Sequence, residues 1–263
     1  MKSPLAALGL SLSLLALAGP ASAQSAQAAT AGPRVEAVYS AHARGMNVGD
    51  FTYNFSQNGQ AYEASAQRRV TGLARSLLGS QQDYSYSVRG AVASNGDLRP
   101  QAYTHRGGRR DRVVRSTFTA DDITTTAEPR MGMGNPAATQ AQKRGAVDQL
   151  TAIASLITAD ADPCSGTVKV YMDGRSRFDF VLTPNGRVNV NTAAYQGEAL
   201  RCSVQFRPIA GFSDPQEAAT LTFLFAPTAS GLFAPVRIEM PSDDVGVIRL
   251  EARRLTVNGT RLR

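Results

Sequence analysis

Apolar and polar residues alternate along many short stretches of this chain. Phe51, Tyr53 and Phe55 alternate with hydroxyl and amide side chains, and the same period of two recurs at 236–240 and 248–253. Successive side chains of a strand point to opposite faces, so this period predicts half-buried strands of an antiparallel sheet. The other predicted strands are 35–42, 60–68, 84–93, 100–106, 112–119, 123–128, 167–171, 176–182, 187–191, 200–207 and 220–225.

Asn-Gly and Asp-Gly pairs separate several of these stretches. They occur at 58–59, 95–96, 173–174 and 185–186, each between two predicted strands. Both residues of such a pair can adopt positive φ, which the tight turns of β-hairpins require. We therefore expect a meander in which neighbouring strands pair antiparallel.

Two segments have helical spacing instead. Leu150, Ile153, Ala154 and Ile157 fall on one face of a predicted helix at 147–158. A second, shorter helix is expected at 70–78. The intervening segment 128–146 is rich in Gly, Pro, Met and small residues, and it is predicted to be a loop.

The number of strands limits the choice of fold. A dozen or so strands are too many for a minimal sandwich, and a sheet of this size must protect its edges. The predicted fold is mainly β, an antiparallel open barrel or β-spiral with one or two short helices. No linker divides the chain, so residues 34–263 are expected to form a single domain after a disordered N-terminal lead at 24–33.

The N-terminus has the pattern of a secretory signal peptide. Lys2 precedes an apolar run at 5–18, and Ala21-Ser22-Ala23 forms a small-x-small cleavage site. We expect cleavage between Ala23 and Gln24 and a periplasmic location. No later stretch approaches the roughly 18 to 20 apolar residues that a transmembrane helix needs, so no transmembrane anchor is expected.

The formal net charge of +7 at pH 7 comes almost entirely from arginine. In an exported protein this charge favours anionic envelope components, such as a lipid, lipopolysaccharide or glycan. Export separates the protein from nucleic acid, so no nucleic-acid partner is expected. A genome rich in G and C also enriches arginine, so the net charge alone does not identify a partner.

Cys164 and Cys202 are the two cysteines of the chain. An even pair in an oxidising compartment is expected to form a disulfide, and the alternation around Cys202 points that side chain into the core. The chain has no C-x-x-C spacing, and its two histidines lie far from the cysteines in sequence. A redox or metal site is therefore not predicted.

The densest cationic segment lies between two predicted strands. Its glycines would let backbone N–H groups approach an anion beside the guanidinium groups. It is a candidate anion or glycan contact, with a solvated loop as the alternative. The candidate residues are His105, Arg106, Arg109, Arg110, Arg112 and Arg115.

Familiar catalytic motifs do not occur in the sequence. There is no G-x-S-x-G elbow, H-E-x-x-H pair, Walker loop or dinucleotide fingerprint. Adjacent acidic residues, as at 121–122 and 243–244, are typical of turns. We predict no catalytic residues, no cofactor and no bound metal.

Four segments together resemble a family of exported proteobacterial proteins grouped as a domain of unknown function. They are 39–55, 96–100 with Tyr103, V-D-Q-L at 147–150 and L-F-A-P-V-R-I-E-M at 232–240. A similar architecture is found in the envelope integrity protein B group, exported β-spiral proteins with an internal disulfide. The resemblance implies a periplasmic β-spiral or open barrel that serves envelope homeostasis, and it supplies no catalytic residues.

Two functions are favoured by these observations, and an enzyme, which would need polar residues that converge inside the spiral, is the third alternative. The first is a non-enzymatic periplasmic protein that binds an envelope component or a partner protein. The alternative is a carrier of a hydrophobic ligand, a lipid or lipoprotein, which would need an open apolar cavity of several hundred Å³. Neither function predicts a particular oligomeric state.

Overall fold

The alternating stretches form the strands of one antiparallel sheet. The computed structural model describes residues 32–72, 75 and 83–263, and its strands join a single sheet of 14 strands. The predicted signal peptide, residues 24–31 of the predicted lead and most of the helix expected at 70–78 lie outside the described residues.

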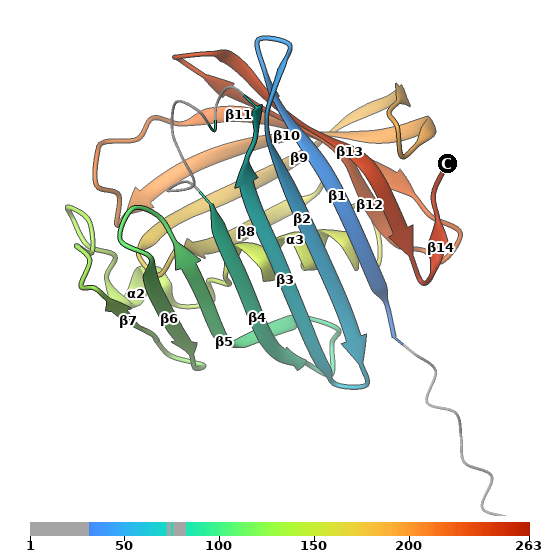
Figure 1. Cartoon of the computed structure of the whole chain (residues 1–263). Helices are drawn as coiled ribbons and strands as arrows, with labels where there is room; N and C mark the ends of the chain where they lie inside the picture. Colours follow the sequence, from blue (N-terminus) through green and yellow to red (C-terminus); the bar gives the residue numbers. More distant parts are fainter. Residues whose placement is uncertain (1–31, 73–74, 76–82) are drawn as a thin grey trace, which may run out of the picture. The chain divides into compact units, whose positions relative to one another are not determined.

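The sheet consists of two meanders joined through the first strand. The first meander, β1 to β7, runs outward from the centre of the sheet in chain order (Figure 1). Its strands are β1 (Arg34–Ala43), β2 (Met46–Asn58), β3 (Ala61–Val70), β4 (Tyr84–Val92), β5 (Leu98–Gly107), β6 (Arg112–Phe118) and β7 (Ile123–Glu128).

The second meander starts at the opposite edge and returns to the centre, where β13 pairs with β1. Among the described strands β7 and β8 do not pair, so the sheet is open. The prediction of a mainly β, open antiparallel sheet is confirmed. The remaining strands are β8 (Gly166–Met172), β9 (Ser176–Asn191), β10 (Gln196–Ala210), β11 (Ala219–Pro227), β12 (Phe233–Ser242), β13 (Gly246–Val257) and β14 (Thr260–Arg261), which pairs with β13.

Three of the four predicted Asn-Gly or Asp-Gly turns lie between strands, but the fourth does not. Asn185–Gly186 lies within β9, which replaces the two strands predicted at 176–182 and 187–191. The pairing of β9 with β10 shifts register beside this dipeptide, and Gly186 has φ +74°. The positive φ of Gly186 therefore serves a β-bulge in a continuous strand, and the predicted hairpin is wrong.

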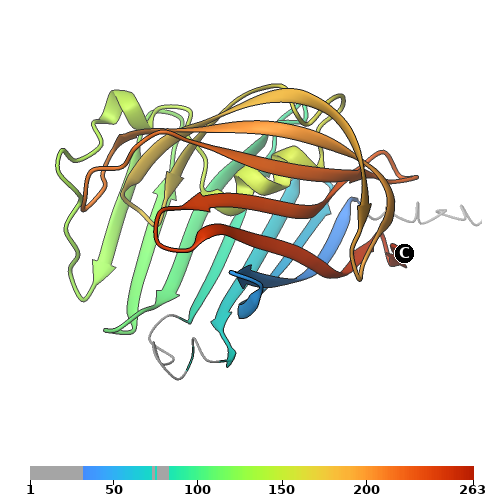
Figure 2. The same ribbon diagram turned by 90° about the horizontal axis from the view of Figure 1, so that it is seen from above.

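Two short helices follow β7, at α2 (Gln140–Lys143) and α3 (Gln149–Ile157). Helix α2 interrupts the segment predicted as a loop, whereas α3 is the helix predicted at 147–158. The sheet curves around α3, so that strands of the first meander lie on one side of the helix and strands of the second meander lie on the other (Figure 2). We call the face of the first meander that meets α3 its inner face.

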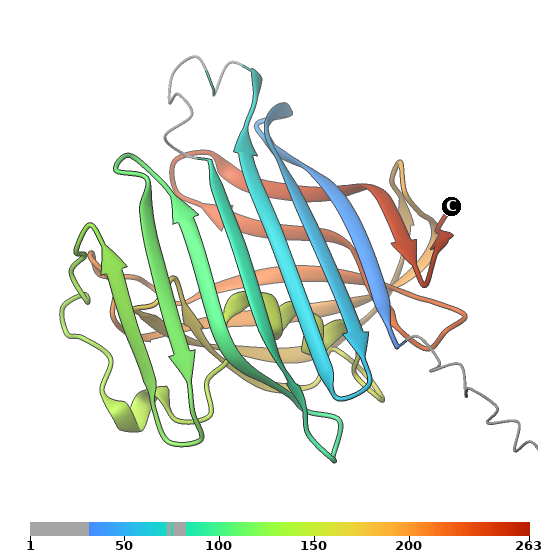
Figure 3. The ribbon, with the colours of Figure 1, turned by 60° about the horizontal axis from the view of Figure 1, so that its bottom comes forward.

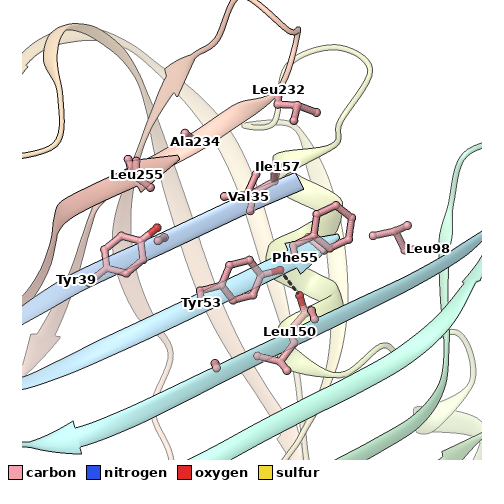
Figure 4. Close-up of a cluster of buried hydrophobic side chains, with 14 of the residues drawn as sticks. Val35, Tyr39, Tyr53, Phe55, Leu98, Leu150, Ile157, Leu232, Ala234 and Leu255 are labelled. Atoms are coloured by element: carbon pink, nitrogen blue, oxygen red, sulfur yellow. Dashed lines mark hydrogen bonds between the residues drawn. The ribbon is translucent and has the colours of Figure 1, made fainter. Parts of the chain in front are cut away.

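The interior between α3 and the sheet is filled by side chains. Leu150 and Ile157 of α3 are 1% and 0% exposed, and they pack with Phe55, Val35 and Leu255 of the sheet (Figure 4). Tyr53 contributes both ring and hydroxyl, because its Oη donates to the carbonyl of Leu150 at 3.0 Å. An apolar cavity that remains beside Tyr53 has a volume of about 20 Å³.

Asp148 caps the N-terminus of α3 from a fully buried position. Its Oδ1 accepts from the amides of Leu150 and Thr151 at 2.9 and 3.1 Å, and its Oδ2 accepts from the Thr151 hydroxyl at 2.6 Å. The Tyr62 hydroxyl completes the chain by approaching Thr151 Oγ1 at 2.8 Å. Burial raises the pKa of the Asp148 carboxyl to about 6, although these hydrogen bonds oppose that rise.

The predicted disulfide joins Cys164 to Cys202, with the two Cα atoms 4.9 Å apart. Cys164 lies in the connection from α3 to β8, and Cys202 is a buried residue of β10. The bond therefore links the chain that follows α3 to the middle of the second meander.

Removing this bond should destabilise the protein. The chain-entropy argument for a closed loop of 38 residues gives about 4 kcal/mol of lost stability for the double substitution Cys164→Ala with Cys202→Ala. Urea unfolding of oxidised wild type and of this variant measures the difference. Two titratable thiols in the denatured, unreduced wild type would contradict the disulfide.

The buried carboxyl predicts a specific pH dependence. Between the unfolded pKa near 4 and the folded pKa of about 6, folded Asp148 keeps a proton that the unfolded chain releases, so its contribution to stability falls as pH rises through this window. Asp148→Asn keeps an acceptor at the helix cap and does not ionise. As pH rises from about 4 to about 7, the free energy of unfolding of Asp148→Asn should therefore increase by about 2 kcal/mol relative to that of wild type.

The control is Asp148→Ala, which lacks the cap and should lose about 1 kcal/mol at acid pH. Chemical unfolding at the two pH values gives each difference. An equal difference between wild type and Asp148→Asn at both pH values would show that the carboxyl does not titrate in this window.

Candidate functional site

The predicted cationic segment forms the end of β5, the β5–β6 turn and the start of β6. The turn uses Gly107 and Gly108 at positive φ. A Cβ at Gly107 would lie 2.2 Å from the backbone carbonyl oxygen of Asp83, so only glycine permits this close approach of the chain to the start of β4. The turn thereby brings its arginines close to His105.

The six predicted residues do not form a single patch. His105 points to the inner face and is 6% exposed. Arg106 points outward and forms a salt bridge with Asp111 of the same turn, where Arg106 Nε donates to Asp111 Oδ1 at 2.9 Å. Arg115 also points outward, so it lies on the opposite face of the sheet from His105.

The other predicted arginines share a pocket with His105. This arginine pocket has a volume of about 300 Å³. It is lined by the arginines Arg109, Arg110, Arg112 and Arg175, by His105 and Asp173, and by Tyr84 and Met131. The structure thus brings together four of the six predicted residues and separates Arg106 and Arg115 from them.

Asp173 and Arg175 reach the pocket from the β8–β9 turn of the second meander. Gly174, between them, packs against the inner face of β6 and β7, where a Cβ would lie 2.7 Å from side-chain carbons of Val114 and Thr125. The sequence signalled a turn at 173–174, but nothing local indicated which strands that turn would touch. Sequence reasoning therefore missed both residues as part of the site.

A hydrogen-bond cluster forms the inner end of the arginine pocket. Asp173 Oδ1 accepts from Gln149 Nε2 at 3.0 Å and from the Tyr103 hydroxyl at 3.3 Å. His105 Nδ1 lies 3.4 Å from Tyr103 Oη and 3.7 Å from Asp173 Oδ1. Gln149 belongs to the first turn of α3 and also donates to Tyr103 Oη, so the helix fixes the position of the cluster.

Burial and the neighbouring charges together favour the neutral form of His105. Burial lowers the pKa of His105 below its ordinary value of 6.5, and Arg112 and Arg175 lower it further, while Asp173 opposes them. Burial also raises the pKa of the Tyr103 hydroxyl well above 10, so this hydroxyl remains a hydrogen-bond donor. Four arginines and one carboxylate leave the pocket strongly cationic.

Two of the arginines are anchored by backbone carbonyls. Arg112 donates to the carbonyls of Pro129 and Arg130 at 2.7 and 3.2 Å, and Arg175 donates to the carbonyl of Gly132 at 3.4 Å. These contacts hold the segment after β7 against the pocket. Arg110 forms no hydrogen bond or ion pair with another residue in the described part of the chain, so its guanidinium is available to a ligand.

A larger hollow, of about 670 Å³, lies on the outer face of the first meander, the face seen in Figure 3. Short hydroxyl side chains such as Ser65, Ser87 and Thr104 form much of its surface. Its charged residues have both signs: Arg34, Arg89 and Arg115 with Glu36 and Glu63. The concentration of one sign of charge therefore distinguishes the smaller arginine pocket.

The described residues contain neither a metal-binding cluster nor a helix that could span a membrane. Across 32–72, 75 and 83–263, no three His, Cys, Asp or Glu side chains are grouped so that they could hold a metal ion. Within the same residue ranges, no helix has the length and apolar character needed to cross a membrane.

Comparison with known proteins identifies a family. A family model described as "Protein of unknown function (DUF3108)" matches residues 38–253, which include all of the arginine pocket. No curated protein and no solved structure matches the chain. The match covers most of the sequence, and the chain therefore belongs to the DUF3108 family of proteins of unknown function.

Proposed function

We propose that this protein is an exported, non-enzymatic binding protein whose arginine pocket takes an anionic group of a cell-envelope component. The observation that carries the proposal is the convergence of Arg109, Arg110, Arg112 and Arg175 on one pocket. They come from two meanders that are far apart in sequence, so the fold concentrates positive charge at this place. Guanidinium groups bind phosphate and carboxylate through paired, charge-assisted hydrogen bonds.

The size of the pocket restricts the ligand group. A volume of about 300 Å³ is at the low end for small-molecule sites and suits a headgroup or a sugar-linked anion rather than an acyl chain. A carrier of a hydrophobic ligand would need a cavity of several hundred Å³, and the apolar cavity beside Tyr53 holds about 20 Å³. A pocket of about 400 Å³ near α2 contains Phe118 and Ile123, but charged side chains of Arg99, Asp122, Lys143 and Arg144 also line it. The geometry therefore favours anion binding over the carrier alternative.

Export to the periplasm is the second part of the proposal. The signal-peptide pattern of residues 1–23 supports it, and so does the Cys164–Cys202 disulfide, because such bonds persist in oxidising compartments. A role in envelope homeostasis is proposed from the resemblance to exported proteobacterial proteins and to the envelope integrity protein B group.

The export proposal predicts the N-terminus of the mature protein. When the full chain is expressed in a bacterium, the periplasmic fraction should contain protein that begins at Gln24. Intact-mass measurement of that fraction checks the cleavage site. Full-length protein retained in the cytoplasm would contradict export.

The binding proposal predicts that removing a pocket arginine weakens binding to anionic vesicles more than removing an arginine from another surface does. Arg110→Ser should weaken sedimentation with phosphatidylglycerol vesicles by about tenfold or more, because a hydrogen bond to a charged group contributes roughly 1.5 to 3 kcal/mol. Arg115→Ser is the matched control, since it removes the same charge from the outer face. Its binding should remain within about twofold of wild type.

The outcomes distinguish anion binding in the pocket from attraction by the net charge of the protein. Equal losses in the two variants would show that the vesicles respond to net charge alone, which would contradict a pocket. Phosphatidylcholine vesicles should not sediment the protein, and added salt should weaken the binding to anionic vesicles.

A further inference from the structure

Among the described residues that line the arginine pocket, His105 is the one side chain of a type that ordinarily gains or loses a charge between about pH 5 and pH 8. Of the two histidines in the chain, His42 lies on β1, away from this pocket. His105 is buried among groups from every element that meets the pocket. These are Tyr84 and Tyr86 of β4, Tyr103 of β5, Arg109 and Arg110 of the β5–β6 turn, Arg112 of β6, Gln149 of α3, and Asp173 and Arg175 of the β8–β9 turn.

The balance of these groups depends on whether an anion is present. Burial and the nearby guanidinium groups oppose protonation of the imidazole, and among the described residues Asp173 is the carboxylate that favours it. An anion bound to the arginines offsets their charge at the ring. The imidazolium then becomes more stable relative to the neutral ring, since a nearby negative charge favours the charged form.

The hydrogen-bond cluster can accommodate the added proton. The neutral ring can accept from Tyr103 Oη through Nδ1, which lies 3.4 Å away. In the protonated ring, the imidazolium can form an ion pair with Asp173, whose Oδ1 lies 3.7 Å from Nδ1, while the Tyr103 hydroxyl donates to the same carboxylate at 3.3 Å. In neither protonation state do two N–H or O–H donors point at each other. Protonation of His105 therefore requires only that Nδ1 and the Asp173 carboxylate move closer together.

We propose that His105 takes up a proton from solvent when an anion enters the arginine pocket, so that the pocket binds anions more tightly as pH falls. The inference rests on the anion-binding function proposed above and adds its regulation. Because binding and proton uptake are linked, each must favour the other. An acidified periplasm or surface layer would then increase occupancy of the pocket without any change in ligand concentration.

The test compares affinity at two pH values. Phosphatidylglycerol vesicles are the probe, because a phosphodiester keeps its charge throughout this range. Wild type should bind them about tenfold more tightly near pH 5.5 than near pH 8. In His105→Gln that ratio should fall to about one, and in His42→Gln, the matched control, it should equal the wild-type ratio.

Arg110→Ser separates this inference from the proposed function. It should weaken binding at both pH values and keep much of the pH ratio, because His105 is intact. If wild type binds through Arg110 and shows no pH dependence, the proton coupling is wrong and the anion pocket stands. If wild type binds at neither pH, both proposals fail.

A second measurement uses wild type alone, in case His105→Gln does not fold. Calorimetric titration with the same vesicles near pH 6.5, in two buffers of different ionisation enthalpy, reports the protons taken up on binding. Unequal heats that correspond to net uptake of protons support the proposal. Equal heats in the two buffers would overturn it.

Discussion

Helix α3 places polar backbone groups inside an apolar interior, and buried hydrogen-bond partners make this possible. Asp148 accepts from the first amides of the helix, and the hydroxyl of Tyr53 donates to the carbonyl of Leu150. Tyr62 reaches Thr151 in the same turn. These contacts fix the N-terminal turn of α3 against β2 and β3, and Gln149 in that turn is thereby held between Tyr103 and Asp173.

The arginine pocket concentrates charges that repel one another, and the surrounding structure offsets that repulsion. Asp173 supplies one negative charge at the inner end of the pocket. Backbone carbonyls of the segment after β7 accept from Arg112 and Arg175. The guanidinium groups are thus partly satisfied before a ligand arrives, while Arg110 on the turn makes no such contact among the described residues. Of the four pocket arginines, Arg112 and Arg175 are thus fixed by backbone carbonyls, whereas Arg110 can adapt to a ligand.

The fold could be predicted from the sequence because strand period and turn chemistry are local properties. Alternation at Phe51, Tyr53 and Phe55 predicts a strand with one buried face, and β2 has that pattern. The same local reasoning failed at Asn185–Gly186, since a glycine with positive φ serves a bulge as readily as a turn. The alternation of faces along β5 and β6 could also have separated Arg106 and Arg115 from His105.

The rest of the site depends on contacts between distant parts of the chain. Asp173 and Arg175 enter the pocket only because the second meander folds back onto the inner face of the first. Nothing near residue 173 in the sequence specifies His105 or Tyr103 as a neighbour. The role of Gln149 was not predicted either, because the sequence does not show which face of α3 meets β5.

The pairing of β1 with β13 has a consequence for synthesis of the chain. A ribosome completes β1 first and β13 nearly last, although the two strands are neighbours in the middle of the sheet. Until β13 emerges, β1 has one open edge of unpaired amides and carbonyls, which is a template for pairing with other chains. A chain that stops before residue 246 leaves that edge of β1 unpaired, so nascent and truncated forms have a further open strand edge besides those of β7 and β8.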